Sequence, residues 1–123
     1  MSVYIEASIK TPSIEMDEKE GRISIKGISI PEDPHEFYHP LMAAIEDYRT
    51  HPAEKTALDL HLEYFNTSST LILRNLIKNL GEIREKTELV VNWFFESDDE
   101  DMKEAGEEFK MLFSELNFNI TAV

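Results

Sequence analysis

Cysteine is absent from the 123-residue sequence. Disulfide bonds, thiolate metal sites and cysteine nucleophiles are therefore excluded. Apolar runs are short, and none approaches the roughly 20 residues that a membrane-spanning helix needs. The first residues, MSVYIEASIK, contain neither the basic segment nor the apolar segment of a secretory signal. These absences predict a cytoplasmic protein with no membrane partner.

Clusters of lysine and arginine are also missing. The sequence has 25 acidic residues against 12 basic ones, for a formal net charge of −13. Because binding to a nucleic-acid backbone draws on clustered Lys and Arg, nucleic acids are not expected as partners. What is present suffices for a core, since 41% of the residues are hydrophobic and 10% are aromatic. That composition predicts one folded domain over residues 1–123.

Hydrophobic spacing predicts alternating strands and helices. Strands are expected through Ile14 and Met16, Arg22 to Ile30, Ala57 to Phe65, Leu89 to Phe95 and Phe118 to Ala122. The first two form a hairpin that turns at Asp17–Gly21, and a phase change at Gly27 indicates a β-bulge. Helices are expected after Asp33, after the segment 66–69, and after Ser97. The order β-β-α-β-α-β-α-β predicts a mixed sheet with parallel neighbours joined by right-handed crossovers.

The side chains of the central strand alternate strictly between apolar and polar. Its apolar side comprises Leu58, Leu60, Leu62 and Tyr64, and its polar side Asp59, His61 and Glu63. A sheet covered on both faces would have near-continuous apolar strands instead. The pattern therefore predicts a two-layer α/β domain with the helices mainly on one face. The open face, which also carries Asn92, is a candidate protein-binding surface.

Two helix starts carry the pattern of a capping box. Asp33 is followed by Glu36, and Ser97 is followed by Glu100. In the first helix the predicted core stripe begins at Phe37. The helix after the segment 66–69 is expected to bury Leu73, Leu76, Ile77 and Leu80, and Trp93 is expected to face inward from its strand. In the last helix the residues predicted to face inward are Met102, Ala105, Phe109, Leu112, Phe113 and Leu116.

The segment from His35 to His39 matches H-E-x-x-H, the signature of zinc metalloproteases. That chemistry needs two histidines one helical turn apart, a third ligand, and Glu36 as general base. Glu36 already belongs to a capping box, and Pro40 follows the second histidine directly. We interpret the match as accidental and expect no bound metal. A small zinc hydrolase using His35, Glu36 and His39 is the alternative.

A run of capping residues, Asn66-Thr67-Ser68-Ser69-Thr70, stands where a strand passes into a helix. The free N–H groups and the positive dipole end of a helix N-terminus favour an anion. A phosphoryl group on one of these hydroxyls would add up to about −2 charges where the fold accommodates it. The plainer interpretation is an N-cap formed by Asn66 or Thr67. No glycine-rich phosphate loop is present, and no cofactor is expected.

Four segments carry a resemblance to known proteins: Gly27–Asp33, Glu36–Tyr38, Tyr64–Ser69 and Trp93. The turn resembles that of the anti-sigma-factor antagonists, STAS-like domains in which an Asp-Ser-Ser-Gly turn carries a regulatory phosphoserine. Over nearly its whole length the chain more closely resembles the SiaC family of regulatory phosphoproteins. The resemblance implies an antagonist-like fold and a role in partner switching.

The resemblance also implies which residues form the site. In the SiaC family the threonine of the turn is phosphorylated, and this residue corresponds to Thr67. Asn66 and Ser69 replace the Asp and Gly of the antagonist turn, so Ser68 is the alternative phosphorylation site. The residues expected to contact a partner are Glu63, Asn66, Thr67, Ser68 and Ser69.

The expected partners follow from the same resemblance. A Ser/Thr kinase similar to the anti-sigma kinases would phosphorylate the turn, and a metal-dependent phosphatase would reverse the modification. The unphosphorylated, non-catalytic protein would bind an effector, for which a diguanylate cyclase is the candidate. An antagonist of an anti-sigma factor, with transcription as its output, is a further alternative.

Overall fold

Six strands form one mixed sheet in the computed structural model, which describes residues 2–123. The strands are β1 (Val3–Ile5), β2 (Ser13–Asp17), β3 (Arg22–Ser29), β4 (Lys55–Phe65), β5 (Glu88–Phe95) and β6 (Asn117–Ala122). The helices are α1 (Pro34–Tyr48), α2 (Thr67–Gly81) and α3 (Glu100–Leu112). The predicted order is confirmed, and it is preceded by β1, a three-residue strand that the sequence pattern does not predict.

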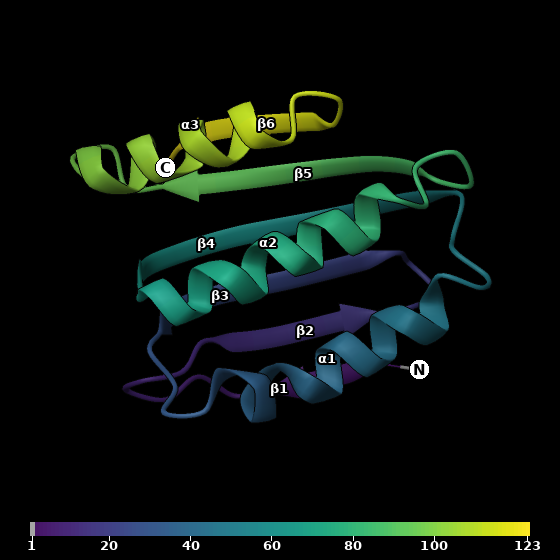
Figure 1. Ribbon diagram of the computed structural model, residues 1–123, viewed down its shortest axis with the longest axis horizontal. Helices are drawn as coiled ribbons and strands as arrows, with labels where there is room; N and C mark the ends of the chain where they lie inside the picture. Colours follow the sequence, from purple (N-terminus) through teal and green to yellow (C-terminus); the bar gives the residue numbers. More distant parts are fainter. Residues whose placement is uncertain (1) are drawn as a thin grey trace.

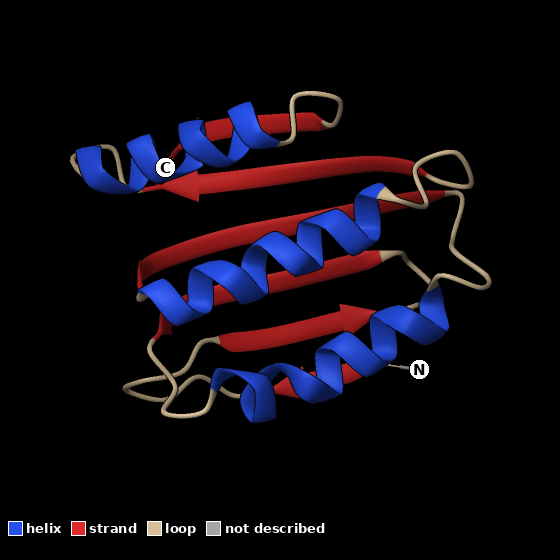
Figure 2. Cartoon of the chain, viewed as in Figure 1, coloured by secondary structure: helices blue, strands red, loops and turns tan. Residues whose placement is uncertain are grey.

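The order of the strands in the sheet is the same as their order in the chain. β1, β2 and β3 pair antiparallel, whereas β3 to β6 pair parallel. Each helix connects a parallel strand to the next one in the same direction across the sheet. Right-handed crossovers that always advance in one direction place every helix on the same face. All three helices accordingly lie in front of the sheet (Figures 1 and 2), which confirms the predicted two-layer arrangement with one open face. Within residues 2–123, none of the helices is long and apolar enough to cross a membrane.

A tight turn joins β2 to β3, as predicted. Gly21, the last residue of this turn, has φ 66°, a left-handed conformation that side chains with a Cβ rarely adopt. A Cβ at this position would also collide with the main-chain oxygen of Lys55. Glycine is therefore required where the hairpin passes the start of β4.

The pairing of β3 with β4 shifts near the ends of both strands. Gly27 pairs with Leu62, but the next pair is Ile28 with Tyr64, so that Glu63 is skipped. The predicted irregularity at Gly27 is confirmed, but the extra residue belongs to β4. The predicted phase change within β3 is wrong, because Ser29 is buried on the same side as Ile23 and Ile25. The prediction that Tyr64 faces the core is wrong, because after the skip its side chain is 58% exposed. β4 therefore ends with an exposed tyrosine just before the turn that leads into α2.

α1 begins at the predicted cap, where Asp33 Oδ1 accepts a hydrogen bond from the amide of Glu36 at 3.1 Å. The core stripe, however, begins at Tyr38 and not at Phe37, which is only partly buried. Tyr38 is fully buried because its hydroxyl has a partner inside the protein, Ser29 Oγ, at 2.7 Å. The first turn of α1 is thereby attached to the end of β3.

The N-cap of α3 lies two residues after the predicted one. Asp99 Oδ1 accepts a hydrogen bond from the amide of Met102 at 3.0 Å, so Asp99 and not Ser97 is the N-cap. The prediction that Leu112 faces inward is also wrong, because α3 ends at this residue and its side chain is 49% exposed. Phe113, the C-cap residue, is buried as predicted.

Trp93 lies at the centre of the packing between α3 and the sheet. It is 1% exposed, as its predicted inward orientation requires, and its Nε1 donates to the main-chain oxygen of Met102 at 3.0 Å. Its ring stacks on Phe109 at 5.2 Å and on Phe118 at 6.4 Å between centroids. Because Gly106 has no side chain, α3 can approach the indole ring closely at this position. The aromatic cluster thus fixes α3 over β5 and β6.

Candidate functional site

The predicted capping segment, residues 66–70, lies where β4 ends and α2 begins, at the carboxyl end of the parallel strands (Figure 1). Asn66 is the N-cap, and its Oδ1 accepts a hydrogen bond from the amide of Ser69 at 3.0 Å. Thr67 is the first residue of α2. The other amides of the first helical turn have no acceptor within the helix and point outward from its N-terminus. An anion at this end of α2 would meet N–H donors and the positive end of the helix dipole.

Four hydroxyl side chains follow Asn66, and three of them are already engaged. Ser68 Oγ donates to Asn66 Oδ1 at 3.2 Å, and Thr70 Oγ1 donates to the main-chain oxygen of Asn66 at 3.2 Å. Ser69 Oγ donates to the main-chain oxygen at the end of β3, at 3.0 Å. Within residues 2–123, Thr67 is the member of this set whose hydroxyl has no hydrogen-bond partner, and it is exposed. The geometry therefore favours Thr67 over Ser68 as the hydroxyl available to another molecule.

A chain of buried hydroxyl groups lies behind the turn. Ser29 Oγ is 2.7 Å from the hydroxyl of Tyr38 and 2.9 Å from Ser69 Oγ. The carbonyl of Ser29 also accepts the amide of Asn66, at 3.2 Å. One arrangement of protons satisfies every group: Tyr38 donates to Ser29, Ser29 donates to Ser69, and Ser69 donates to the Ser29 carbonyl. The start of α2 is thereby connected to both β3 and α1.

The burial of these hydroxyl groups changes the pKa of Tyr38. Burial raises the pKa of its phenol from 10.0 to about 12, because the charged phenolate would lose its hydration, and the hydrogen bond with Ser29 lowers the pKa by a smaller amount. The side chain of Tyr38 therefore remains a neutral phenol to well above physiological pH. Within residues 2–123, no buried side-chain polar atom lacks a hydrogen-bond partner.

The predicted contact residues do not all lie on the surface. Thr67, Ser68 and Glu63 are exposed, and Asn66 is partly exposed. Ser69 is 0% exposed, so its predicted role as a direct contact for a partner is wrong. Its hydroxyl faces the buried chain because the third helical position points back toward the sheet, and Ser69 anchors the turn instead.

The histidine motif of α1 lacks the geometry of a metal site. His35, Glu36 and His39 are all exposed. Across residues 2–123, no three or more His, Asp or Glu side chains are grouped so that they could hold a metal ion. The structure therefore gives the zinc hydrolase alternative no third ligand.

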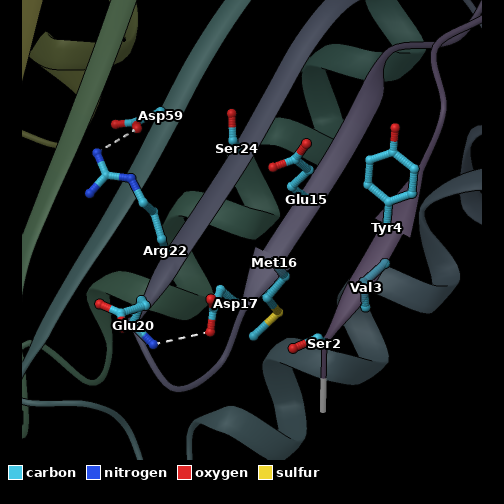
Figure 3. Close-up of a pocket in the computed structure, with 10 residues that line it drawn as sticks. All are labelled: Ser2, Val3, Tyr4, Glu15, Met16, Asp17, Glu20, Arg22, Ser24 and Asp59. Atoms are coloured by element: carbon cyan, nitrogen blue, oxygen red, sulfur yellow. Dashed lines mark hydrogen bonds and ion pairs between the residues drawn. The ribbon is translucent and has the colours of Figure 1, made fainter.

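The open face of the sheet carries the polar side chains that the strand pattern predicts. Asp59 accepts from Arg22 at 3.1 Å and from Asn92 at 2.8 Å, and His61 Nε2 lies 3.0 Å from Glu96 Oε2. Beside these pairs is a hollow of about 620 Å³ over β1, β2 and β3. Figure 3 shows Tyr4, Glu15 and Ser24 around it, with the Arg22–Asp59 ion pair at its rim. The carboxylate of Asp59 is held by two donors, which leaves it unsuited to act as a free base.

Sequence reasoning missed Ser29 and Tyr38 as parts of the site. The signal for Ser29 was its spacing, since it follows Ile25 by four residues and Ile23 by six, and an even separation places side chains on the same face of a strand. The assumed phase change at Gly27 moved Ser29 to the wrong face. Nothing in the helical spacing distinguishes Tyr38 from Phe37, because both precede Leu41 by about one turn.

Comparisons with known proteins agree with this geometry. A family model described as SiaC family regulatory phosphoprotein matches residues 5–123. An uncharacterized protein of Pseudomonas aeruginosa strain UCBPP-PA14 is 29% identical over 109 residues, which cover 88% of this chain and 86% of the relative. The crystal structure of apo-SiaC from Pseudomonas aeruginosa superposes with a TM-score of 0.85 at 29% identity, over 99% of each chain.

A second solved structure is the crystal structure of the diguanylate cyclase SiaD in complex with its activator SiaC from Pseudomonas aeruginosa. It matches with a TM-score of 0.91 at 29% identity, over 98% of this chain and 99% of the matched chain. The family match spans nearly all of the sequence, and the solved structures share the whole fold. The chain therefore belongs to the SiaC family of regulatory phosphoproteins.

Proposed function

We propose that this chain is a non-catalytic regulatory protein that binds a diguanylate cyclase while Thr67 is unphosphorylated. A Ser/Thr kinase phosphorylates Thr67 and so releases the cyclase, and a metal-dependent phosphatase restores the binding form. The cyclase is preferred over an anti-sigma factor as the effector because a SiaC of Pseudomonas aeruginosa is the activator of the diguanylate cyclase SiaD in a solved complex.

One observation carries the choice of residue. Among the hydroxyls of the turn, that of Thr67 is exposed and has no partner within residues 2–123. Phosphorylating it breaks no hydrogen bond of the folded chain, whereas a phosphoryl group on Ser68 would displace its bond to Asn66. The modified threonine would sit at the N-terminus of α2, where the dipole favours an anion. The domain should therefore remain folded in both states.

The same modification has a large effect on a bound partner. Groups that packed against a neutral hydroxyl would have to remove the hydration of a dianion. Without compensating contacts such burial costs at least several kcal/mol, and about 4 kcal/mol corresponds to nearly a thousandfold in affinity. A switch based on affinity alone is therefore sufficient, with no change of fold.

Calorimetric titration of the diguanylate cyclase of the same organism tests the proposal. The unmodified protein is compared with protein carrying phosphothreonine at position 67, installed during translation. We expect tight binding by the unmodified protein and by Thr67→Ala, and a loss of about a hundredfold or more for the phosphorylated form. Ser68→Ala is the matched control and should bind like the wild type. Equal affinities of the two forms would remove the proposed mechanism.

A further inference from the structure

The three helices that cover the sheet differ in charge. α1 carries three acidic residues and no Lys or Arg, and α3 carries five acidic residues against two lysines. α2 carries Arg74 and Lys78 and no acidic residue. All 25 acidic residues of the chain thus lie outside the helix that begins with Thr67. The outer side of α2 is therefore locally basic, although the protein as a whole has a net charge of −13.

The exposed side chains of α2 form a continuous line, which we call the α2 stripe. It consists of Thr67, Leu71, Arg74, Asn75 and Lys78, all of them exposed. Thr67, Leu71, Arg74 and Lys78 follow one another at intervals of three or four residues, and Asn75 lies four residues after Leu71, so the five side chains share one side of the helix. Leu71 is a large apolar side chain that is 56% exposed. The stripe thus combines an apolar contact with two cations.

The stripe borders a groove of about 470 Å³ between α2 and the end of α3. Leu71 lines it from α2 and Leu112 lines it from α3, where Leu112 is 49% exposed. Arg74 and Lys78 lie along the same groove. Glu115 also lines it, but within residues 2–123 neither cation forms an ion pair or a side-chain hydrogen bond. Both charges are therefore available to an incoming molecule.

We propose that the α2 stripe is the docking surface for an acidic amphipathic helix of the partner protein. The apolar edge of that helix packs against Leu71 and Leu112, and its carboxylates pair with Arg74 and Lys78. Charge complementarity selects this occupant, because a basic segment would be attracted more strongly to almost any other part of this acidic chain. A groove between two helices with exposed leucines on both sides suits a helix as the occupant.

This inference rests on the proposed function and gives it a direction. Thr67 heads the stripe, one helical turn before Leu71. A phosphoryl group there brings about −2 charges next to the carboxylates of an acidic helix. Repulsion between these like charges weakens binding, whereas a basic partner segment would be bound more tightly. Release upon phosphorylation is therefore the outcome that an acidic partner segment predicts.

The test uses two synthetic amphipathic peptides of equal length with the same leucine edge. One has glutamate on its polar side and the other has lysine. Titration of each peptide is followed through the backbone amide resonances of the ¹⁵N-labelled protein. We expect the acidic peptide to shift resonances of residues 67–78 and around Leu112. Arg74→Glu with Lys78→Glu should weaken its binding roughly tenfold or more. The matched control reverses two exposed lysines of α3, Lys103→Glu with Lys110→Glu, and should leave the affinity unchanged.

The same variants are then titrated with the diguanylate cyclase, which separates this inference from the proposed function. If the cyclase binds the Arg74→Glu, Lys78→Glu variant as tightly as the wild type, the docking surface is wrong while the Thr67 switch still stands. If no cyclase binds the wild type but the acidic peptide maps to the α2 stripe, the proposed function fails and the surface stands. Shifts elsewhere on the protein, no shifts, or self-association of the chain through α2 without peptide binding would each overturn the inference.

Discussion

Gly106 is the position where the packing of α3 is most sharply testable. A Cβ added there would lie 2.5 Å from Cδ1 and 2.7 Å from Nε1 of Trp93, well inside van der Waals contact. The indole has little room to retreat, because Nε1 is bonded to the oxygen of Met102 and the ring is stacked on Phe109 and Phe118. Gly106→Ala should therefore force either α3 away from the sheet or Trp93 out of its position.

Two opposing contributions set the size of the effect. Overpacking a core costs typically about 1–3 kcal/mol, and the strain should be near the upper end because the contacted ring is fixed. Alanine is more favourable than glycine inside a helix by about 1 kcal/mol, and this gain in stability offsets part of the cost. The expected net loss is about 2 kcal/mol, or about 8 °C in melting temperature for a domain of this size.

Thermal and urea unfolding followed by circular dichroism measure the loss. Gly81→Ala is the matched control, since its Cβ would meet only the flexible end of Leu116 at 3.3 Å, and it should change stability little. In a Trp93→Phe background, where the ring is smaller, Gly106→Ala should become neutral or stabilising. A melting temperature that is unchanged or raised in the wild-type background would refute the packing of α3 against the indole.

Three further predictions concern the turn, the buried phenol and the histidine motif. Asn66→Ala should cost about 1 kcal/mol of unfolding free energy, because the amide of the third helical residue loses its cap, and urea titration measures it. The pKa of Tyr38 rises from 10.0 to about 12 on folding, so the folded state favours the neutral phenol. The resulting stabilisation of the folded state is complete below pH 10 and is lost as the pH rises through 12. That loss amounts to about 2–3 kcal/mol and should be missing in Tyr38→Phe, as urea titrations between pH 9 and 12 would show. His35→Ala should leave the melting temperature nearly unchanged, and about one zinc per chain by elemental analysis, lost in this variant, would contradict our interpretation of the motif.

The sequence predicts those features that local chemistry decides. The cap at Asp33, the buried stripe of α2 and the inward orientation of Trp93 depend on residues close together in the chain, and the structure confirms them. The position of Thr67 at a helix start is predictable for the same reason. Each of these signals arises within a few residues and does not depend on a distant partner.

The errors arise where a distant contact decides between two local solutions. Phe37 and Tyr38 both fit the helical spacing, and the choice is made by Ser29, which pairs with the tyrosine across the core. Tyr64 fits the alternation of its strand, but the pairing with β3 skips a residue and turns it outward. The sequence pattern is compatible with an exposed Ser69. In the structure its hydroxyl is buried, because it donates a hydrogen bond to the main-chain oxygen of Ser29. Local patterns identify the turn, and tertiary contacts determine which of its hydroxyls faces solvent.

The agreement between strand order and chain order has a consequence for synthesis on the ribosome. The β2–β3 hairpin can form first, and each later strand joins the edge that the preceding strand has just completed. No segment has to be inserted between strands that are already paired, which removes one source of misassembly. The growing chain nevertheless exposes one unpaired strand edge at each stage, first β3, then β4, then β5. A chain truncated before Asn117 would leave the edge of β5 uncovered beside the aromatic cluster, so release of incomplete chains would favour aggregation.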